Sequence, residues 1–170
     1  KRLNFANFLQ NPTASIFTRG TTMSNFAMVF PGQGSQAVGM LADLAPQYPI
    51  VEATFKQASD VLGYDLWDLV QNGSAEDLGQ TQRTQPALLT ASVAIFRVWQ
   101  EKFPELKPSV MAGHSLGEYS ALVCAGVLDF QDAVKLVELR GNAMQQAVPA
   151  GTGAMFAIIG LENDAIINAC

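Results

Sequence analysis

The 170-residue sequence is poor in charge, and its few cations are scattered. Charged residues make up 15% of the chain, against about a quarter in ordinary soluble domains. We therefore expect much of the chain to be buried or to lie in an interface. The net charge is −5 and the sequence has no Lys/Arg cluster. This excludes nucleic-acid binding through neutralisation of phosphates.

Cysteine and histidine are also scarce. Cys124 and Cys170 lack the spacing of metal ligands, and a single histidine adds no ligand cluster, so no metal site is expected. Cys124 lies in the apolar run ALVCAGV, which predicts a buried, inert thiol. No apolar run reaches the roughly 18 residues of a membrane-spanning helix. We expect a protein of a reducing, cytoplasmic compartment that makes no use of a membrane.

Residues 1–22 differ in composition from the rest of the chain. They contain Lys1, Arg2 and Arg19 but no acidic residue, and they are rich in Ser, Thr and Asn. A transit peptide has this composition. However, the chain opens with Lys, and Met23 stands just before the first strand-like run, so an upstream extension outside the folded core is favoured. We predict the folded part to begin at Met23.

From Met23 onward, short apolar runs alternate with longer helical patterns, which predicts an α/β fold. Strands are expected at residues 26–30, 109–112 and 155–159. Helices are expected at about 38–62 (broken near Pro46 and Pro49), from Ser74, at 86–103, at 116–125 and at 130–147. The helix from Pro86 is apolar nearly all round and should be central, with Pro86 in its first turn. Gly126 should end the helix before it, and Asp129 should cap the helix after it.

A serine stands at the junction of the second strand and its following helix, in Gly113-His114-Ser115-Leu116-Gly117. This order predicts a nucleophile elbow, in which a sharp turn holds the Ser hydroxyl out of the chain. Gly113 and Gly117 would be required because strand and helix pass too closely there for side chains. Free N–H groups at the helix start could stabilise an oxyanion. A glycine-bearing turn with Ser as a helix cap is the alternative.

A glycine-containing loop follows the first strand. Gly32-x-Gly34-x-x-Ala37 resembles a dinucleotide-binding fingerprint, but that reading requires a second strand with an acidic end about 20 residues later. Glu52 has the distance but lies in a helical pattern, so the fingerprint is rejected. A tight turn at Gln33 could direct a backbone N–H at a substrate, or could simply be solvated.

Arg140 is the most informative charge in the sequence. Its neighbours three and four residues away on the expected helix are Leu136, Val137, Ala143 and Met144, all of them apolar. No local ion pair is available, and a guanidinium in such surroundings needs an anion to offset its desolvation. The anion could be a side chain from elsewhere in the fold or a ligand.

The segment AGHSLGEYSALVCAG resembles the active-site segment of the bacterial malonyl-CoA:acyl-carrier-protein transacylases. FPGQGSQ at 30–36, TQPALLTASVA at 84–94 and VELRGNAMQ at 137–145 match the same family in the same order. The resemblance implies that Ser115 carries a malonyl group from coenzyme A to the phosphopantetheine thiol of acyl carrier protein, in fatty acid biosynthesis. It further implies an oxyanion hole from the N–H groups of Gln33 and Leu116, and a malonyl carboxylate held by Arg140.

The resemblance also implies an α/β-hydrolase-like large subdomain, incomplete in this chain, at residues 23–148. Residues 149–170 would open an inserted ferredoxin-like small subdomain. The family's base histidine would lie beyond the last residue, so the 170-residue chain by itself could be inactive. His114 is adjacent to Ser115, but adjacent side chains diverge there, which favours an imidazole near the site rather than the base.

Malonyl-CoA and acyl carrier protein are the expected partners of a monomeric enzyme, and no cofactor is expected because the coenzyme A thioester is a substrate. Two other enzymes remain open: a loading domain of a polyketide-type synthase, and a serine hydrolase or thioesterase. An inert fragment that only binds a carrier protein is the alternative outside enzymes.

Overall fold

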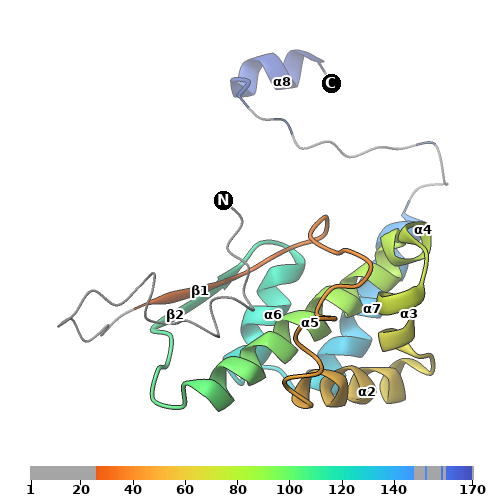
Figure 1. Cartoon of the computed structure of the whole chain (residues 1–170). Coiled ribbons are helices and arrows are strands. Elements are labelled where there is room, and N and C mark those ends of the chain that lie inside the picture. The colour runs from red at the N-terminus through yellow and green to blue at the C-terminus, as the bar shows by residue number, and fades with distance from the viewer. Residues whose placement is uncertain (1–25, 148–151, 153–157, 159, 170) are drawn as a thin grey trace.

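Two short parallel strands carry the loops that form the site. The computed structural model describes residues 26–147, 152, 158 and 160–169. Strands β1 (Ala27–Phe30) and β2 (Val110–Gly113) pair in parallel, with Ala27 opposite Val110 and Phe30 opposite Gly113. In a parallel pair, both carboxyl ends lie at the same edge of the sheet. The loops after β1 and β2 therefore leave the sheet side by side (Figure 1).

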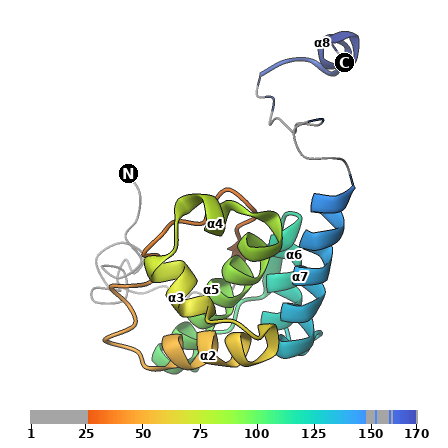
Figure 2. The ribbon, with the colours of Figure 1, turned by 90° about the vertical axis from the view of Figure 1, so that its right-hand side faces the viewer.

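Helices account for most of the remaining described residues (Figures 1 and 2). They are α2 (Ile50–Leu62), α3 (Leu66–Asn72), α4 (Ala75–Gly79), α5 (Thr81–Lys102), α6 (Leu116–Cys124), α7 (Phe130–Gln146) and α8 (Asn163–Ala169). The predicted mixed α/β fold is thus confirmed. The predicted segment 1–22 lies outside the described residues, and of the predicted strand at 155–159 the structure describes only Ile158.

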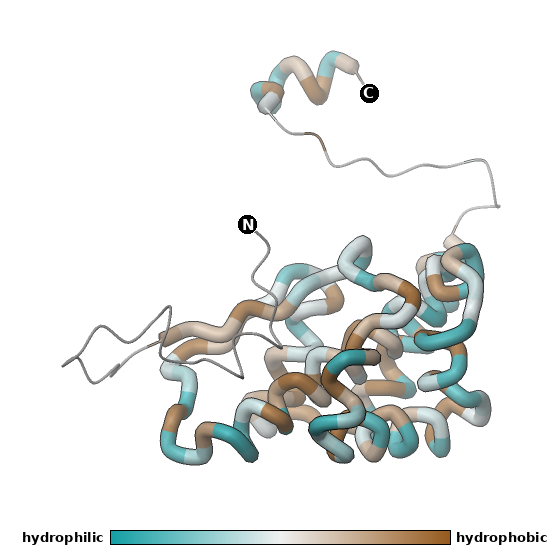
Figure 3. Tube along the Cα trace, viewed as in Figure 1, coloured by the Kyte–Doolittle hydropathy of each residue, from teal (hydrophilic) through white to brown (hydrophobic). Residues whose placement is uncertain are grey.

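The long helix α5 is the centre of the fold, as its all-round apolar sequence predicts. Thirteen of its 22 residues are buried, and it packs against α2, α4, α6 and α7. The approach to α7 is closest at Gly141, where an added Cβ would lie 2.5 Å from the Cα of Gln82. The hydropathy colouring shows apolar segments along α5 and both strands, whereas the outer turns are hydrophilic (Figure 3).

The prediction that Pro86 opens this helix is wrong. The helix begins at Thr81, so Pro86 lies in its second turn. Proline there deprives the Gln82 carbonyl of its helical donor. The turn stays helical because Thr84, Gln85 and Pro86 are all buried in the packed core, and because α7 packs directly on Gln82.

The predicted helix over 38–62 is only half correct. Its second half is α2, but residues 38–47 form a series of hydrogen-bonded turns instead. Gly39 and Leu41 have positive φ values of 78° and 66°, which a right-handed helix excludes. These turns are fixed to α3, since the Gly39 N–H donates to the Val70 carbonyl (2.8 Å) and the Gln71 amide donates to the Met40 carbonyl (3.0 Å).

The predicted helix boundaries at Ser74, Gly126 and Asp129 are confirmed. The Ser74 hydroxyl accepts from the Asp77 N–H, and the Asp129 carboxylate accepts from the N–H groups of Gln131 and Asp132. Gly126 has φ 75° just after α6. Helices α6 and α7 are therefore separate elements, and both pack against α5.

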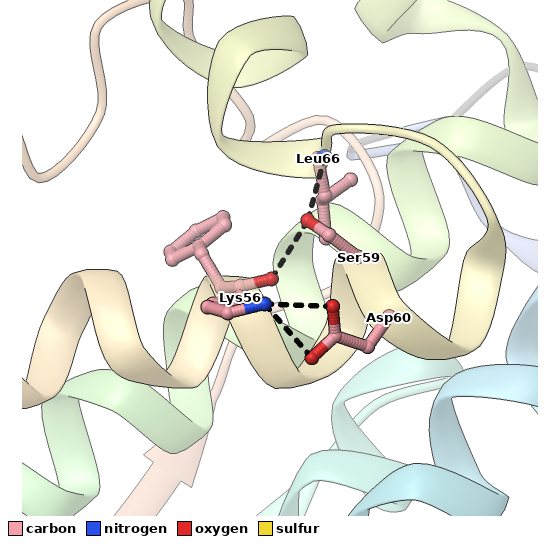
Figure 4. A network of polar contacts seen from close by, with 5 residues as sticks. Lys56, Ser59, Asp60 and Leu66 are labelled. Atoms are coloured by element: carbon pink, nitrogen blue, oxygen red, sulfur yellow. Dashed lines mark hydrogen bonds and ion pairs between the residues drawn. The ribbon is translucent and has the colours of Figure 1, made fainter.

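A side-chain bond that the sequence did not predict joins α2 to α3 (Figure 4). The Ser59 hydroxyl donates to the Phe55 carbonyl and accepts from the Leu66 N–H, both at 2.9 Å. Beside it, Lys56 and Asp60 form an ion pair at 2.9 Å, the only ion pair within 4 Å among the described residues. None of the helices in the described ranges combines the length and apolarity needed to cross a membrane.

Candidate active site

The turn between β2 and α6 has the geometry predicted for a nucleophile. Strand β2 ends at Gly113, α6 begins at Leu116, and Ser115 between them has φ 55° and ψ −112°. Leu41 is the only other non-glycine residue with positive φ in the described part of the chain. A conformation of this kind costs on the order of 1–3 kcal/mol and persists only where the surrounding structure imposes it. Ser115 is exposed at this turn.

Gly113 and Gly117 allow the neighbouring backbones to approach closely, and this close approach fixes the conformation of Ser115. A Cβ on Gly113 would lie 2.0 Å from the carbonyl carbon of Gly117, and a Cβ on Gly117 would lie 2.3 Å from the Phe30 carbonyl oxygen. These neighbours are backbone atoms, which cannot move aside individually. The predicted reason for glycine at both positions is therefore confirmed: β1, β2 and α6 converge at the turn.

The loop after β1 lies against the same turn. A Cβ on Gly32 would lie 3.0 Å from the His114 carbonyl oxygen. Gly34 has φ 105°, and its N–H donates to the Gln36 side chain (2.8 Å), so the chain turns sharply directly after Gln33. The exposed Gln33 side chain contacts the Thr81 hydroxyl at 3.4 Å. The structure thus brings the Gln33 loop and the Ser115 turn together.

Leu116 and His114 flank the serine in different ways. Leu116 is buried and is the first residue of α6, where N–H groups have no carbonyl of the preceding turn to bond. The His114 carbonyl accepts from the Gly117 N–H (3.0 Å), whereas its side chain is exposed. Among the hydrogen bonds of the described residues, none joins the His114 imidazole to Ser115.

Arg140 on α7 points directly at the serine. Its Nη2 donates to Ser115 Oγ at 3.0 Å, and its Nη1 donates to Gln85 Oε1 at 2.8 Å. The guanidinium carbon lies 5.6 Å from the centre of the Tyr119 ring, at the outer limit of a cation–π contact. The sequence predicted that an anion would offset the desolvation of Arg140. In the described part of the chain, no carboxylate lies within 4 Å of its guanidinium. Instead, a neutral amide and a hydroxyl accept from the guanidinium.

Gln85 is a site residue that sequence reasoning missed. It lies in the quoted segment TQPALLTASVA, but the helix predicted from the sequence began at Pro86, so no helical pattern pointed to Gln85. Its side chain is fully buried (0% exposed). Only the packing of α5 on α7 brings it to Arg140, 55 positions away in sequence.

Burial perturbs ionisable groups elsewhere in the fold. It raises the pKa of the Cys124 thiol to about 12, although nearby Arg97 acts in the opposite direction, which supports the predicted inert thiol. The predicted burial is only partial, because Cys124 keeps some exposed surface. Burial also lowers the pKa of Arg97 and raises the pKa of Tyr64 to about 12. No group of three or more His, Cys, Asp or Glu side chains in the described ranges could hold a metal ion.

The arrangement defines a class of protein. A strand, a serine with strained backbone and a helix in immediate succession form the turn used by α/β enzymes that carry acyl groups on serine. An arginine directed at that serine distinguishes this site from an apolar acyl pocket.

Comparison with known proteins identifies the family. The model of the acyl transferase domain matches residues 27–168, most of the chain. The chain therefore belongs to the acyl transferase domain family.

Two relatives in particular share most of this sequence, and both are named malonyl CoA-acyl carrier protein transacylase. The protein from Haemophilus influenzae is 81% identical over 148 residues, which cover 87% of this chain and 47% of the relative. The protein from Escherichia coli K12 is 68% identical over 148 residues, which cover 87% of this chain and 48% of the relative. The chain spans about half the length of the curated relatives it matches.

Solved structures show the same fold. An acyl carrier protein S-malonyltransferase from Vibrio cholerae superimposes with a TM-score of 0.80 at 74% identity, covering 86% of this chain and 48% of that one. A malonyl-transacylase solved in complex with its type II PKS acyl-carrier protein gives a TM-score of 0.82 at 71% identity, with coverage of 86% and 47%.

Proposed function

We propose that this chain is the nucleophile-bearing part of an enzyme that transfers a malonyl group from malonyl-CoA to the phosphopantetheine thiol of acyl carrier protein. The observation that carries the proposal is the 3.0 Å contact between Arg140 Nη2 and Ser115 Oγ. It puts a guanidinium beside the atom that would hold the acyl group, where it can bind an acid at the far end of that group. The names of the relatives support the same activity.

The first half-reaction follows from the elbow geometry. Ser115 Oγ attacks the thioester carbonyl, and the N–H groups of Gln33 and Leu116 stabilise the resulting oxyanion. The C–S bond then breaks, coenzyme A leaves as its thiol, and malonyl remains as an ester on Ser115. A general base must take the serine proton and return it to the leaving sulfur. Arg140 has no lone pair for that task, and the family resemblance assigns it to a histidine outside these 170 residues.

The second half-reaction reverses the first with another thiol. The phosphopantetheine thiol of the carrier protein attacks the malonyl ester, loses its proton to the same base, and leaves as the malonyl thioester while Ser115 regains its proton. The malonyl thioester of coenzyme A is a substrate and coenzyme A is a product, so the reaction as proposed uses no separate cofactor or metal. Transfer to a thiol rather than to water distinguishes this enzyme from a serine hydrolase or thioesterase.

Arg140 supplies selectivity for malonyl over acetyl. Its planar pair of N–H donors fits a carboxylate, and an acetyl group would leave the guanidinium without that partner. A site built to bond a polar substrate group discriminates strongly against analogues that lack the group.

The domain organisation completes the proposal. Residues 23–148 would form the first part of an α/β-hydrolase-like large subdomain, residues 149–170 the start of a ferredoxin-like insert, and residues 1–22 an extension. We further propose a monomeric enzyme of the cytoplasm that acts in fatty acid biosynthesis. A polyketide carrier is the second candidate acceptor, because the malonyl-transacylase relative solved with a carrier was bound to a type II PKS acyl-carrier protein.

The test follows a labelled malonyl thioester in the complete enzyme, which includes the base histidine, and in the 170-residue chain alone. Mass spectrometry should find malonyl on Ser115, a carrier thiol should remove it, and Ser115→Ala should abolish the adduct. Arg140→Ala should lower malonyl acylation by about 10²-fold and change acetyl acylation far less, because only malonyl loses an ion pair. An adduct released to water alone would favour the hydrolase. An adduct on the complete enzyme but none on the 170-residue chain would favour the inert fragment. Malonyl selectivity that survives Arg140→Ala would refute the role of Arg140.

A further inference from the structure

The only side chain besides Ser115 that accepts a hydrogen bond from Arg140 is Gln85, among the described residues. Gln85 has no exposed surface, and a buried amide is costly unless its polar atoms are bonded. Its Oε1 accepts from Arg140 Nη1 at 2.8 Å, while its Nε2 faces the sulfur of Met144 at 3.4 Å. Since sulfur accepts only weakly and an arginine cannot accept at all, the amide oxygen faces the guanidinium.

The consequence for the guanidinium is geometric. Nη1 of Arg140 donates to Gln85, and the second terminal nitrogen, Nη2, therefore points at Ser115 Oγ. Arginine has a long flexible side chain, so an unsupported guanidinium would sample other orientations. Gln85 lies in the second turn of α5, where its side chain is fully buried, and it fixes the direction of Arg140.

The second consequence concerns charge. The amide is neutral, and no carboxylate in the described ranges lies within 4 Å of Arg140. The ion pair found in those ranges joins Lys56 to Asp60, on another helix. A glutamate has nearly the same size and would accept the same hydrogen bond. It would also neutralise the guanidinium as a buried ion pair, which is strong once formed.

The geometry points to Gln85 as a positioning residue that determines specificity: it orients Arg140 toward Ser115 while leaving the positive charge uncompensated for the carboxylate of the incoming acyl group. This inference rests on the proposed malonyl transfer and deepens it. It explains why an amide, and neither an acid nor an apolar residue, lies at this fully buried position of α5.

The isosteric variant Gln85→Glu tests the charge. In the complete enzyme, which includes the base histidine, we expect acylation of Ser115 by malonyl-CoA to fall about 10²-fold, whereas acylation by acetyl-CoA changes by less than about threefold, because only malonyl competes with the new carboxylate. A purely structural role would instead lower both rates together. The ratio of the two rates is therefore the readout, with the melting temperature measured alongside.

Gln57→Glu is the matched control. Gln57 Oε1 accepts from Arg97 Nη1 at 3.0 Å, so the same substitution is made beside another arginine that has only neutral partners among these contacts. The ratio of malonyl to acetyl acylation should stay at the wild-type value in this variant. A drop like that of Gln85→Glu would show that added negative charge in general, and not position 85, causes the effect.

Gln85→Met tests the orientation and serves as the second variant if Gln85→Glu does not fold. Methionine is neutral and of similar length but cannot hold the guanidinium, so malonyl acylation should fall about tenfold with acetyl acylation little changed. Wild-type rates in Gln85→Met, or wild-type selectivity in Gln85→Glu, would overturn the inference. A wild-type enzyme that contains the base histidine and still forms no malonyl adduct on Ser115 would refute the proposed function itself.

Discussion

At the scale of single residues, burial determines which charges are available for chemistry. Arg140 bonds neutral partners, so no neighbouring acid compensates its positive charge. Glu138, on the same helix, behaves differently. Burial raises the pKa of its carboxyl, although nearby Arg83 acts to lower it. The same Glu138 contributes to the raised pKa of Tyr64. The cluster of Tyr64, Arg83 and Glu138 thus makes stability depend on pH.

Glu138 predicts the sign of that dependence. A carboxyl whose pKa is higher in the folded than in the unfolded protein favours folding at low pH, and this contribution is lost as pH rises through the folded pKa. The melting temperature of the wild type minus that of Glu138→Gln should therefore decrease between about pH 4 and pH 7. Glu101→Gln, at an exposed position, is the control. A difference that grows with pH would show that the Arg83 attraction outweighs burial.

At the scale of elements, close backbone contacts hold the site together. Strand β1 touches α6 through the Phe30 carbonyl at Gly117, and α5 touches α7 through Gln82 at Gly141. The first contact fixes the serine turn on the sheet. The second brings Gln85 and Arg140 to each other.

Gly117→Ala tests the first contact. Its Cβ would overlap backbone atoms of Phe30 and Pro31, so we expect a loss of about 1–3 kcal/mol in the free energy of unfolding, measured with urea. Gly79→Ala provides the control, because nothing lies within 4 Å of a Cβ there. It should stabilise the protein by up to about 1 kcal/mol, since Gly79 is the last residue of a helix. Equal effects at the two positions would contradict the steric argument.

At the scale of the whole molecule, the described residues cover only one face of the sheet. Met28 and Phe30 face the helices, whereas Val29 (76% exposed) and Val110 (59% exposed) face solvent. Parallel sheets normally have both faces covered. The face that carries Val29 and Val110 is therefore a place where non-specific association is expected.

Replacing the two exposed valines tests whether this face of the sheet promotes association. The double variant Val29→Thr/Val110→Thr should bind less of the hydrophobic dye ANS and aggregate more slowly on heating, with its free energy of unfolding changed by less than about 0.5 kcal/mol per site. Val51→Thr is the control, because Val51 is fully buried (0% exposed) and a hydroxyl there should cost about 1–3 kcal/mol. Unchanged dye binding in the double variant would show that the sheet face is not the dye site.

Much of the fold was predictable because its signals are local. The β2–turn–α6 junction and the caps at Ser74 and Asp129 depend on residues within a few positions of one another. The turns at 38–47 and the early start of α5 were mispredicted because packing decided them: Gly39 is bonded to Val70, and Pro86 is held inside a helix by buried neighbours.

The sequence by itself determined the turn that carries the proposed nucleophile, since glycine spacing and a strand-to-helix change around Ser115 leave few other conformations. It also determined that Arg140 needs a partner from outside its own helix. Only the tertiary structure decided what that partner is. Helix packing is non-local, so nothing in the order of residues placed Gln85 at one nitrogen of Arg140 and Ser115 at the other, and from that placement follows the proposed choice of an acidic acyl group.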